Sequence, residues 1–132
     1  MKRPLATLIA CLVSFAAGAS VMWAGQGAQQ ASNATRREPQ FENEHMRVWK
    51  SIIMPHQPLA MHRHEHGRAL IALKGGQLKV VDKDGKPFNV YNWESGKAYW
   101  LDADPPGQMH ADLNDTSAPI EVIVVELKKD KS

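Results

Sequence analysis

Between residues 40 and 127, turn signals divide the chain into short runs rich in valine, isoleucine, tryptophan and tyrosine. The runs are residues 45–54, 68–73, 77–81, 88–93, 97–101, 108–113 and 120–127. Segments containing glycine, proline, asparagine or aspartate separate them, and no window keeps a helical period over three turns. We therefore expect an all-β domain of seven or eight strands, either a sandwich or a jelly-roll barrel.

The beginning of the chain differs from this pattern. Lys2 and Arg3 precede residues 5–24, which carry no charge and are mostly Ala, Leu, Ile, Val and Phe. This is the layout of a secretory signal, with small residues at Ala17-Gly18-Ala19 for cleavage. An uncharged stretch of this length also suffices for an uncleaved membrane anchor. We expect export to the periplasm, either as a soluble protein or tethered to the inner membrane by residues 5–24.

The remaining boundaries follow from composition. Residues 25–39 are polar and unpatterned, which predicts a flexible linker. Residues 40–128 form the predicted β-barrel domain, and residues 129–132 a polar tail. A domain this small buries a modest core, and an open edge strand favours pairing, so a homodimer is expected.

Charge and cysteine content exclude several classes of function. The formal net charge is +2, and Lys2 and Arg3 account for it, so the domain itself is near neutral. A nucleic-acid partner therefore has no electrostatic basis, and membrane contact is expected only through an uncleaved leader. Cys11 is the only cysteine. The exported part can form neither a disulfide nor a cysteine nucleophile.

The histidines are the candidate chemical groups. His62, His64 and His66 alternate in MHRHEHG, and His110 stands alone in PPGQMHADLN. We expect His62 and His64 to lie on a strand, where residues two apart face the same side, so their imidazoles would project together. His110 from another strand would complete a three-nitrogen face suited to zinc, iron, copper, nickel or manganese.

These two segments resemble the two signature motifs of the cupin superfamily. The matching residues are His62, His64 and Gly75 in the first motif, and Pro105, Gly107, His110 and Asn114 in the second. The resemblance covers about residues 48–127. It implies a single-domain cupin-type jelly-roll β-barrel behind a hydrophobic leader. It also implies a metal shell of two histidines, a carboxylate and a third histidine.

The sequence departs from the family pattern at the carboxylate position, where it has Arg68. A guanidinium about 5 Å from a divalent ion repels it by roughly 6 or 7 kcal/mol at an effective dielectric near 20. That value is an upper bound, because Arg68 can turn away or pair with an acid.

Three alternatives for the pocket follow. The first is a three-histidine metal site, with Arg68 turned toward a bound anion. The second uses His66 or Asp112 as the replacement ligand. The third has no metal, and the histidines and Arg68 form a partly cationic pocket for a small carboxylate or another anion. The cofactor is accordingly one divalent transition metal (iron, zinc, manganese or nickel), or none.

Two classes of function remain open. One is a metal-dependent enzyme of the oxygenase or isomerase type, acting on a small acidic molecule that Arg68, Asp112 and Trp100 contact. The other is a non-catalytic binding or sensing module. The enzyme hypothesis predicts solvent access to all three imidazoles. The binding hypothesis predicts an internally satisfied pocket, for example with Arg68 paired to Asp112 or Glu65.

Overall fold

The computed structural model describes residues 33–129, in which all regular structure is β. The strands are β1 Arg36–Glu42, β2 Met46–Ile53, β3 Arg68–Lys74, β4 Gly76–Val81, β5 Pro87–Trp93, β6 Ala98–Leu101, β7 Ala111–Asn114 and β8 Ile120–Leu127. The predicted leader over residues 1–24 lies outside the described residues. Residues 33–129 contain no helix with the length and hydropathy needed to cross a membrane.

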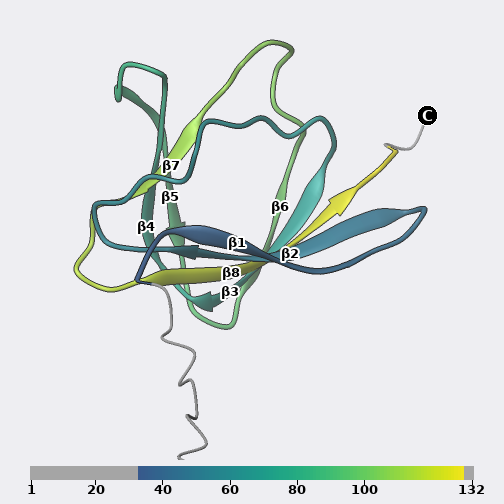
Figure 1. The fold of residues 1–132 in the computed structure, drawn as a ribbon, viewed down its shortest axis with the longest axis horizontal. Coiled ribbons are helices and arrows are strands. Elements are labelled where there is room, and N and C mark those ends of the chain that lie inside the picture. Colours follow the sequence, from purple (N-terminus) through teal and green to yellow (C-terminus); the bar gives the residue numbers. More distant parts are fainter. Residues whose placement is uncertain (1–32, 130–132) are drawn as a thin grey trace, which may run out of the picture. The chain divides into compact units, whose positions relative to one another are not determined.

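The strands form two antiparallel sheets, as the run pattern predicted. One sheet has the order β1-β2-β8-β3-β6 and the other the order β5-β4-β7. In Figure 1, β4, β5 and β7 gather on one side, while β1, β2, β8 and β3 lie side by side below them. Non-consecutive strands are neighbours in both sheets, which is the expected result for a jelly roll.

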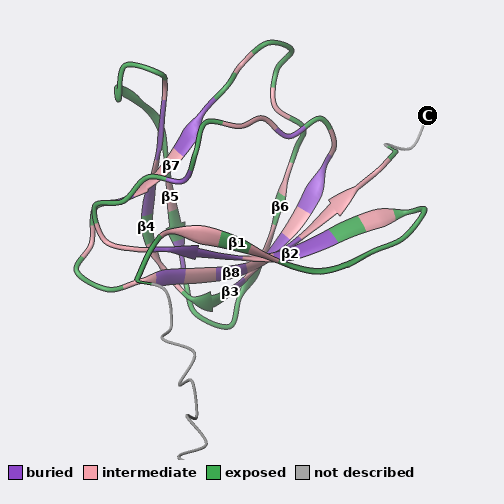
Figure 2. Cartoon of the chain, viewed as in Figure 1, coloured by how far each residue is buried: buried purple, intermediate pink, exposed green. Residues whose placement is uncertain are grey.

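The domain begins earlier than the sequence analysis predicted. Residues 36–39, assigned to the flexible linker, belong to β1, which pairs with β2. β1 is an edge strand with mostly exposed residues (Figure 2), so its sequence lacks the apolar alternation of a half-buried strand. Pro39 interrupts it at a register shift, where a strand tolerates proline.

The apolar core lies between the two sheets. Ile53, Leu78, Ile120 and Val122 are almost completely buried. On β8 and β3, the inward face is apolar along most of its length and charged at one end. Its cross-strand pairs, in order, are Ala72–Val122, Leu70–Val124 and Arg68–Glu126. The charged pair marks the end of the barrel where the functional side chains gather.

Two residues of the cupin motifs have structural roles. A Cβ on Gly75 would lie 2.1 Å from the carbonyl oxygen of Trp93, so only glycine fits where the chain passes from β3 to β4. The fully buried Asn114 donates to the carbonyl oxygens of Ile53 and Ala118, both at 2.8 Å. It also accepts from the backbone N–H and hydroxyl of Thr116. Asn114 thus ties β7 to the end of β2 and to the following turn, a structural role.

Candidate metal centre

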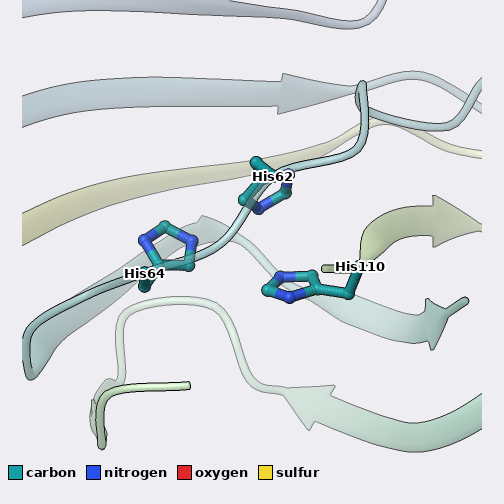
Figure 3. A group of neighbouring side chains, drawn as sticks. All are labelled: His62, His64 and His110. Atoms are coloured by element: carbon teal, nitrogen blue, oxygen red, sulfur yellow. The ribbon is translucent and has the colours of Figure 1, made fainter. Parts of the chain in front are cut away.

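His62, His64 and His110 come together as the sequence predicted. Their ligating nitrogens all lie within 4.8 Å of one another, and the rings turn toward each other (Figure 3). The prediction that His62 and His64 lie on a strand is wrong, because both are in the segment between β2 and β3. A single antiparallel bridge aligns His62 with His110, and each N–H donates to the other's carbonyl oxygen at 2.8 Å. This bridge, and not the predicted strand, therefore brings the rings together.

The Nδ1 atom of each imidazole faces an oxygen acceptor. His62 Nδ1 donates to the Ala60 carbonyl oxygen at 2.7 Å. His64 Nδ1 donates to Glu126 at 2.6 Å. His110 Nδ1 lies 3.3 Å from Asp104 Oδ2. An acceptor at Nδ1 favours the tautomer with its proton there, which leaves the Nε2 lone pair free to bind a metal.

Burial reinforces this arrangement. Loss of solvation lowers the pKa of His62 to about 3, although the Ala60 hydrogen bond acts against the shift. Burial also lowers the pKa of His110, with Asp112 and Asp104 acting against it. Both imidazoles are therefore neutral at neutral pH, as a metal ligand must be.

His62 Nε2 is buried and has no hydrogen-bond partner. An unsatisfied buried nitrogen is costly, and a bound cation would satisfy it.

A carboxylate lies beside these free nitrogens. Asp112 Oδ2 is 3.6 Å from His62 Nε2, and Asp112 Oδ1 is 3.8 Å from His110 Nε2. Two ligands each about 2.1 Å from one tetrahedral ion are about 3.4 Å apart, so these distances come close to those around a shared cation. Burial raises the pKa of Asp112, with His110 and His64 acting against it. The donor set of three imidazoles and one carboxylate fits a divalent transition metal.

Arg68 is buried at this end of the barrel but is already engaged. Its Nη1 donates to the Asp102 carbonyl oxygen at 2.9 Å, and its Nη2 lies 3.6 Å from Asp104 Oδ1. Asp104 also accepts a hydrogen bond from the His64 N–H at 2.7 Å. Arg68 is therefore paired inside the pocket, as the binding hypothesis predicted, although its partner is Asp104 and not Asp112 or Glu65. Glu65 pairs with Arg63 instead.

Sequence reasoning missed Asp104 and Glu126. Glu126 lies opposite Arg68 across the β3–β8 pair, so the two side chains share the inward face. Both acids are mostly buried. The sequence did contain a sign of the role of Glu126. Residues two apart on a strand share a face, so Glu126 falls on the same face of β8 as Val122 and Val124.

A cavity of about 380 Å³ opens beside the cluster. His64, His110, Asp112, Arg68 and Trp100 all contribute to its wall. Trp100 is exposed, and its indole N–H donates to Asp102 at 2.9 Å. His66 belongs neither to the three-histidine group nor to this wall.

The three imidazoles are less accessible to solvent than the enzyme hypothesis predicted. His64 and His110 are each 5% exposed, and only His62 is intermediate. His64 and His110 therefore face the cavity and not bulk solvent.

No protein-family model matches the chain, and no curated protein matches its sequence. Among solved structures, it is similar to a cupin domain from Bordetella pertussis Tohama I. The TM-score is 0.61 at 19% identity, over 73% of this chain and 95% of that one.

It is also similar to a Klebsiella pneumoniae protein with a double-stranded β-helix domain. There the TM-score is 0.53 at 20% identity, covering 77% of this chain and 84% of the other. A cupin domain of an XRE-family transcriptional regulator from Enterobacter cloacae gives 0.52 at 15% identity, covering 74% and 99%. With its two β-sheets and the two motifs at the expected places, the chain has the cupin fold, the double-stranded β-helix.

Proposed function

We propose that this protein is a metal-dependent cupin that holds one divalent transition metal and acts on a small molecule in the adjoining cavity. The observation that carries this proposal is the set of three Nδ1 atoms, each facing an oxygen. That arrangement leaves the Nε2 lone pair of each ring free, and one nitrogen of each ring lies within 4.8 Å of the other two. Second-sphere acceptors of this kind are a common feature of metal-binding histidines.

Asp112 completes the ligand set in this proposal. In the family pattern the first motif supplies a metal-binding carboxylate at the position that Arg68 occupies in this sequence. Asp112 would take the role of that carboxylate. Arg68 does not prevent cation binding, because Asp104 neutralises it at 3.6 Å and Glu126 lies opposite it. A bound divalent metal would supply Lewis acidity or redox chemistry to a ligand in the cavity. The protein would supply the orientation of the ligating rings and a largely dehydrated site.

An oxygenase or isomerase is the proposed reaction type, since the cavity gives a small molecule direct access to the histidine cluster. The alternative is a metal-free pocket for anions, and the charges disfavour it. Arg68 is paired, while Asp104, Asp112 and Glu126 surround the histidines. A metal-free site of this composition does not favour an anion.

The place of action is proposed from the leader. Residues 1–24 have the layout of an export signal, so we propose that the domain works in the periplasm, soluble or tethered. Pairing of two copies through an edge strand stays a prediction.

The test is metal content. Full-length protein purified without a histidine tag should contain close to one equivalent of metal by plasma mass spectrometry. A His62→Ala, His110→Ala double variant should contain almost none. The matched control is His45→Ala, His66→Ala, which removes two histidines outside the group and should keep its metal.

Each protein should also be reloaded with iron, zinc, manganese and nickel while its melting temperature is recorded. A bound metal raises the melting temperature by mass action, and the control should show that rise while the double variant does not. Absence of metal binding in the folded wild-type protein after reloading would sink the metalloenzyme proposal.

A further inference from the structure

Arg37 lies on β1, the strand that sequence analysis did not predict, and it lines the same cavity as His64. Its register partner on β2 is Ser51, which also lines that cavity. The Arg37 guanidinium carbon is 5.1 Å from the centre of the Trp49 ring. Trp49 in turn stacks on His64, with ring centres 5.9 Å apart. Arg37 therefore reaches from an exposed edge strand toward the histidines.

Arg37 and Arg68 differ in what they bind. Arg68 is buried and held by Asp104 and the Asp102 carbonyl oxygen. Within residues 33–129, no carboxylate lies within ion-pair distance of Arg37. Its guanidinium lies over the face of the Trp49 ring instead. A guanidinium over an aromatic ring keeps its edge N–H groups free for a planar acceptor. The unpaired arginine at this cavity is therefore Arg37, and not Arg68.

Electrostatic contact with the cluster supports this placement. Loss of solvation lowers the pKa of Arg37, and Asp112 and Glu126 act against that shift. Arg37 is solvent-exposed by surface area, yet it lies close enough to these acids to interact with them. It remains charged at any physiological pH.

The balance of charge makes anion binding depend on metal. The charged groups around the cluster and its cavity are the guanidiniums of Arg37 and Arg68 and the carboxylates of Asp102, Asp104, Asp112 and Glu126. The carboxylates outnumber the guanidiniums, so the metal-free site repels an anion. One divalent cation cancels this excess of negative formal charge. An anion then gains attraction from both the cation and Arg37.

Part of the remaining wall is apolar and aromatic, beside polar residues such as Asn89 and Gln108. Tyr91 and Trp93 stack with ring centres 5.5 Å apart, and Leu70 and Phe88 also line the cavity. The volume of about 380 Å³ lies in the range of small-molecule sites. These apolar and aromatic side chains offer a surface on which a flat apolar body can pack.

We propose that Arg37 recognises the carboxylate of a small aromatic or similarly flat monocarboxylate, which binds in the cavity when the metal is present. This inference rests on the proposed function, since it requires the cation. It transfers to Arg37 the anion-binding role that sequence analysis gave to Arg68.

The experiment uses full-length protein loaded with Co²⁺, whose visible spectrum reports changes at the metal. Benzoate is titrated, with benzamide as its uncharged counterpart, and binding is followed by calorimetry and by the Co²⁺ spectrum. The variants are Arg37→Ala, Arg37→Lys and the control Arg36→Ala. Arg36 is the neighbouring arginine, pairs with Glu38 at 2.8 Å and does not line the cavity.

Benzoate should bind the Co²⁺ protein. Arg37→Ala should weaken the affinity for benzoate about tenfold, the order expected for a lost charge-assisted hydrogen bond. Arg37→Lys should recover part of that loss, and Arg36→Ala should bind like wild type. Benzamide and metal-free protein should show little binding. All variants should bind Co²⁺ with wild-type affinity, because Arg37 is not a ligand.

The inference is overturned if Arg37→Ala binds benzoate as well as Arg36→Ala does, or if benzamide binds as tightly as benzoate. It is also overturned if Co²⁺ protein binds no benzoate, and in that case the metal site itself stands. Failure of wild-type protein to bind Co²⁺ would instead overturn the proposed function. The two failures are therefore distinguishable.

Discussion

The inside of this barrel has two ends that differ in chemistry although the same strands build both. The apolar end consists of Ile53, Leu78, Ile120 and Val122, all almost fully buried. The histidine end consists of His62, His64, His110, Arg68, Asp104, Asp112 and Glu126. The passage from Val122 to Glu126 on β8 takes two steps along one face. The apolar end therefore supplies stability, while the histidine end bears the desolvation cost of buried charges.

This difference indicates that stability and the proposed metal binding are separable in the molecule. Buried charges do not persist for stability alone, since apolar replacements of similar volume are often at least as stable. Perturbed titratable groups beside a cavity are typical of a functional site. Substitutions at one end should thus leave the property of the other end largely unchanged.

The largest effect is expected from Leu78→Ala, which should lower the free energy of unfolding by about 2–5 kcal/mol through the cavity it creates. Metal affinity of the folded protein should stay unchanged. Urea unfolding of metal-free protein measures the free energy of unfolding, and calorimetric metal titration measures the metal affinity. The control is Val90→Ala on the neighbouring β5, which is 44% exposed and should cost about 0.5 kcal/mol or less. Equal losses in the two variants would contradict the assignment of the core.

Asn114→Ala tests whether a buried polar residue can contribute to stability, like the residues of the apolar end, without contributing to metal binding. The variant removes the amide that donates to the carbonyl oxygens of Ile53 and Ala118, and Thr116 Oγ1 remains as a donor for Ala118 alone, so the variant should cost about 2–3 kcal/mol. Asn92→Ala, an exposed amide that bonds Gln77 at 3.1 Å, is the control and should cost far less. Urea unfolding of both variants decides this. Loss of metal affinity in folded Asn114→Ala would break the separation between the two ends.

Glu126→Ala tests the histidine end. It removes the acceptor 2.6 Å from His64 Nδ1, and loss of such a partner weakens metal binding by roughly 10–100-fold. Competition with a chelator of known affinity measures the change. Glu121→Ala on the same strand is the control, because Glu121 is on the outer face with Lys50 and Lys74. Equal affinities in both variants would mean that Glu126 does not support the metal ligand.

The smallest effect is expected from Glu121→Gln. Hydrogen bonds from Lys50 and then Lys74 lower the pKa of Glu121 below its ordinary value. A carboxyl with a depressed pKa stabilises the folded state above its unfolded pKa, and that contribution is lost as the pH falls through the folded value. The variant should be less stable than wild type by about 1 kcal/mol or less at pH 7. This difference should shrink below about pH 4.5. Urea unfolding across pH is the measurement, and a difference that grows toward acid would refute the assignment.

Much of the fold could be predicted because it depends on local patterns. Turn residues and short apolar runs located seven of the strands, and the motif residues located the three histidines. β1 escaped detection because an exposed edge strand needs no apolar alternation, and its pairing with β2 is visible only in the folded chain. The domain therefore starts at a strand that looks like linker in sequence.

The all-β class, the turn positions and the identity of the three histidines could be read from the amino-acid sequence, since spacing and turn chemistry act over a few residues. The partners of those histidines, in contrast, follow only from the folded chain. Glu126 meets His64 from 62 residues away, and Asp104 meets the same residue from 40 residues away. The tertiary structure also turns Arg68 toward Asp104 and brings Arg37 to the cavity. Charged residues on a strand look alike in sequence whether they face solvent or the barrel. Strand register and cross-strand pairing, which arise from contacts distant along the chain, determine which of them become part of the site.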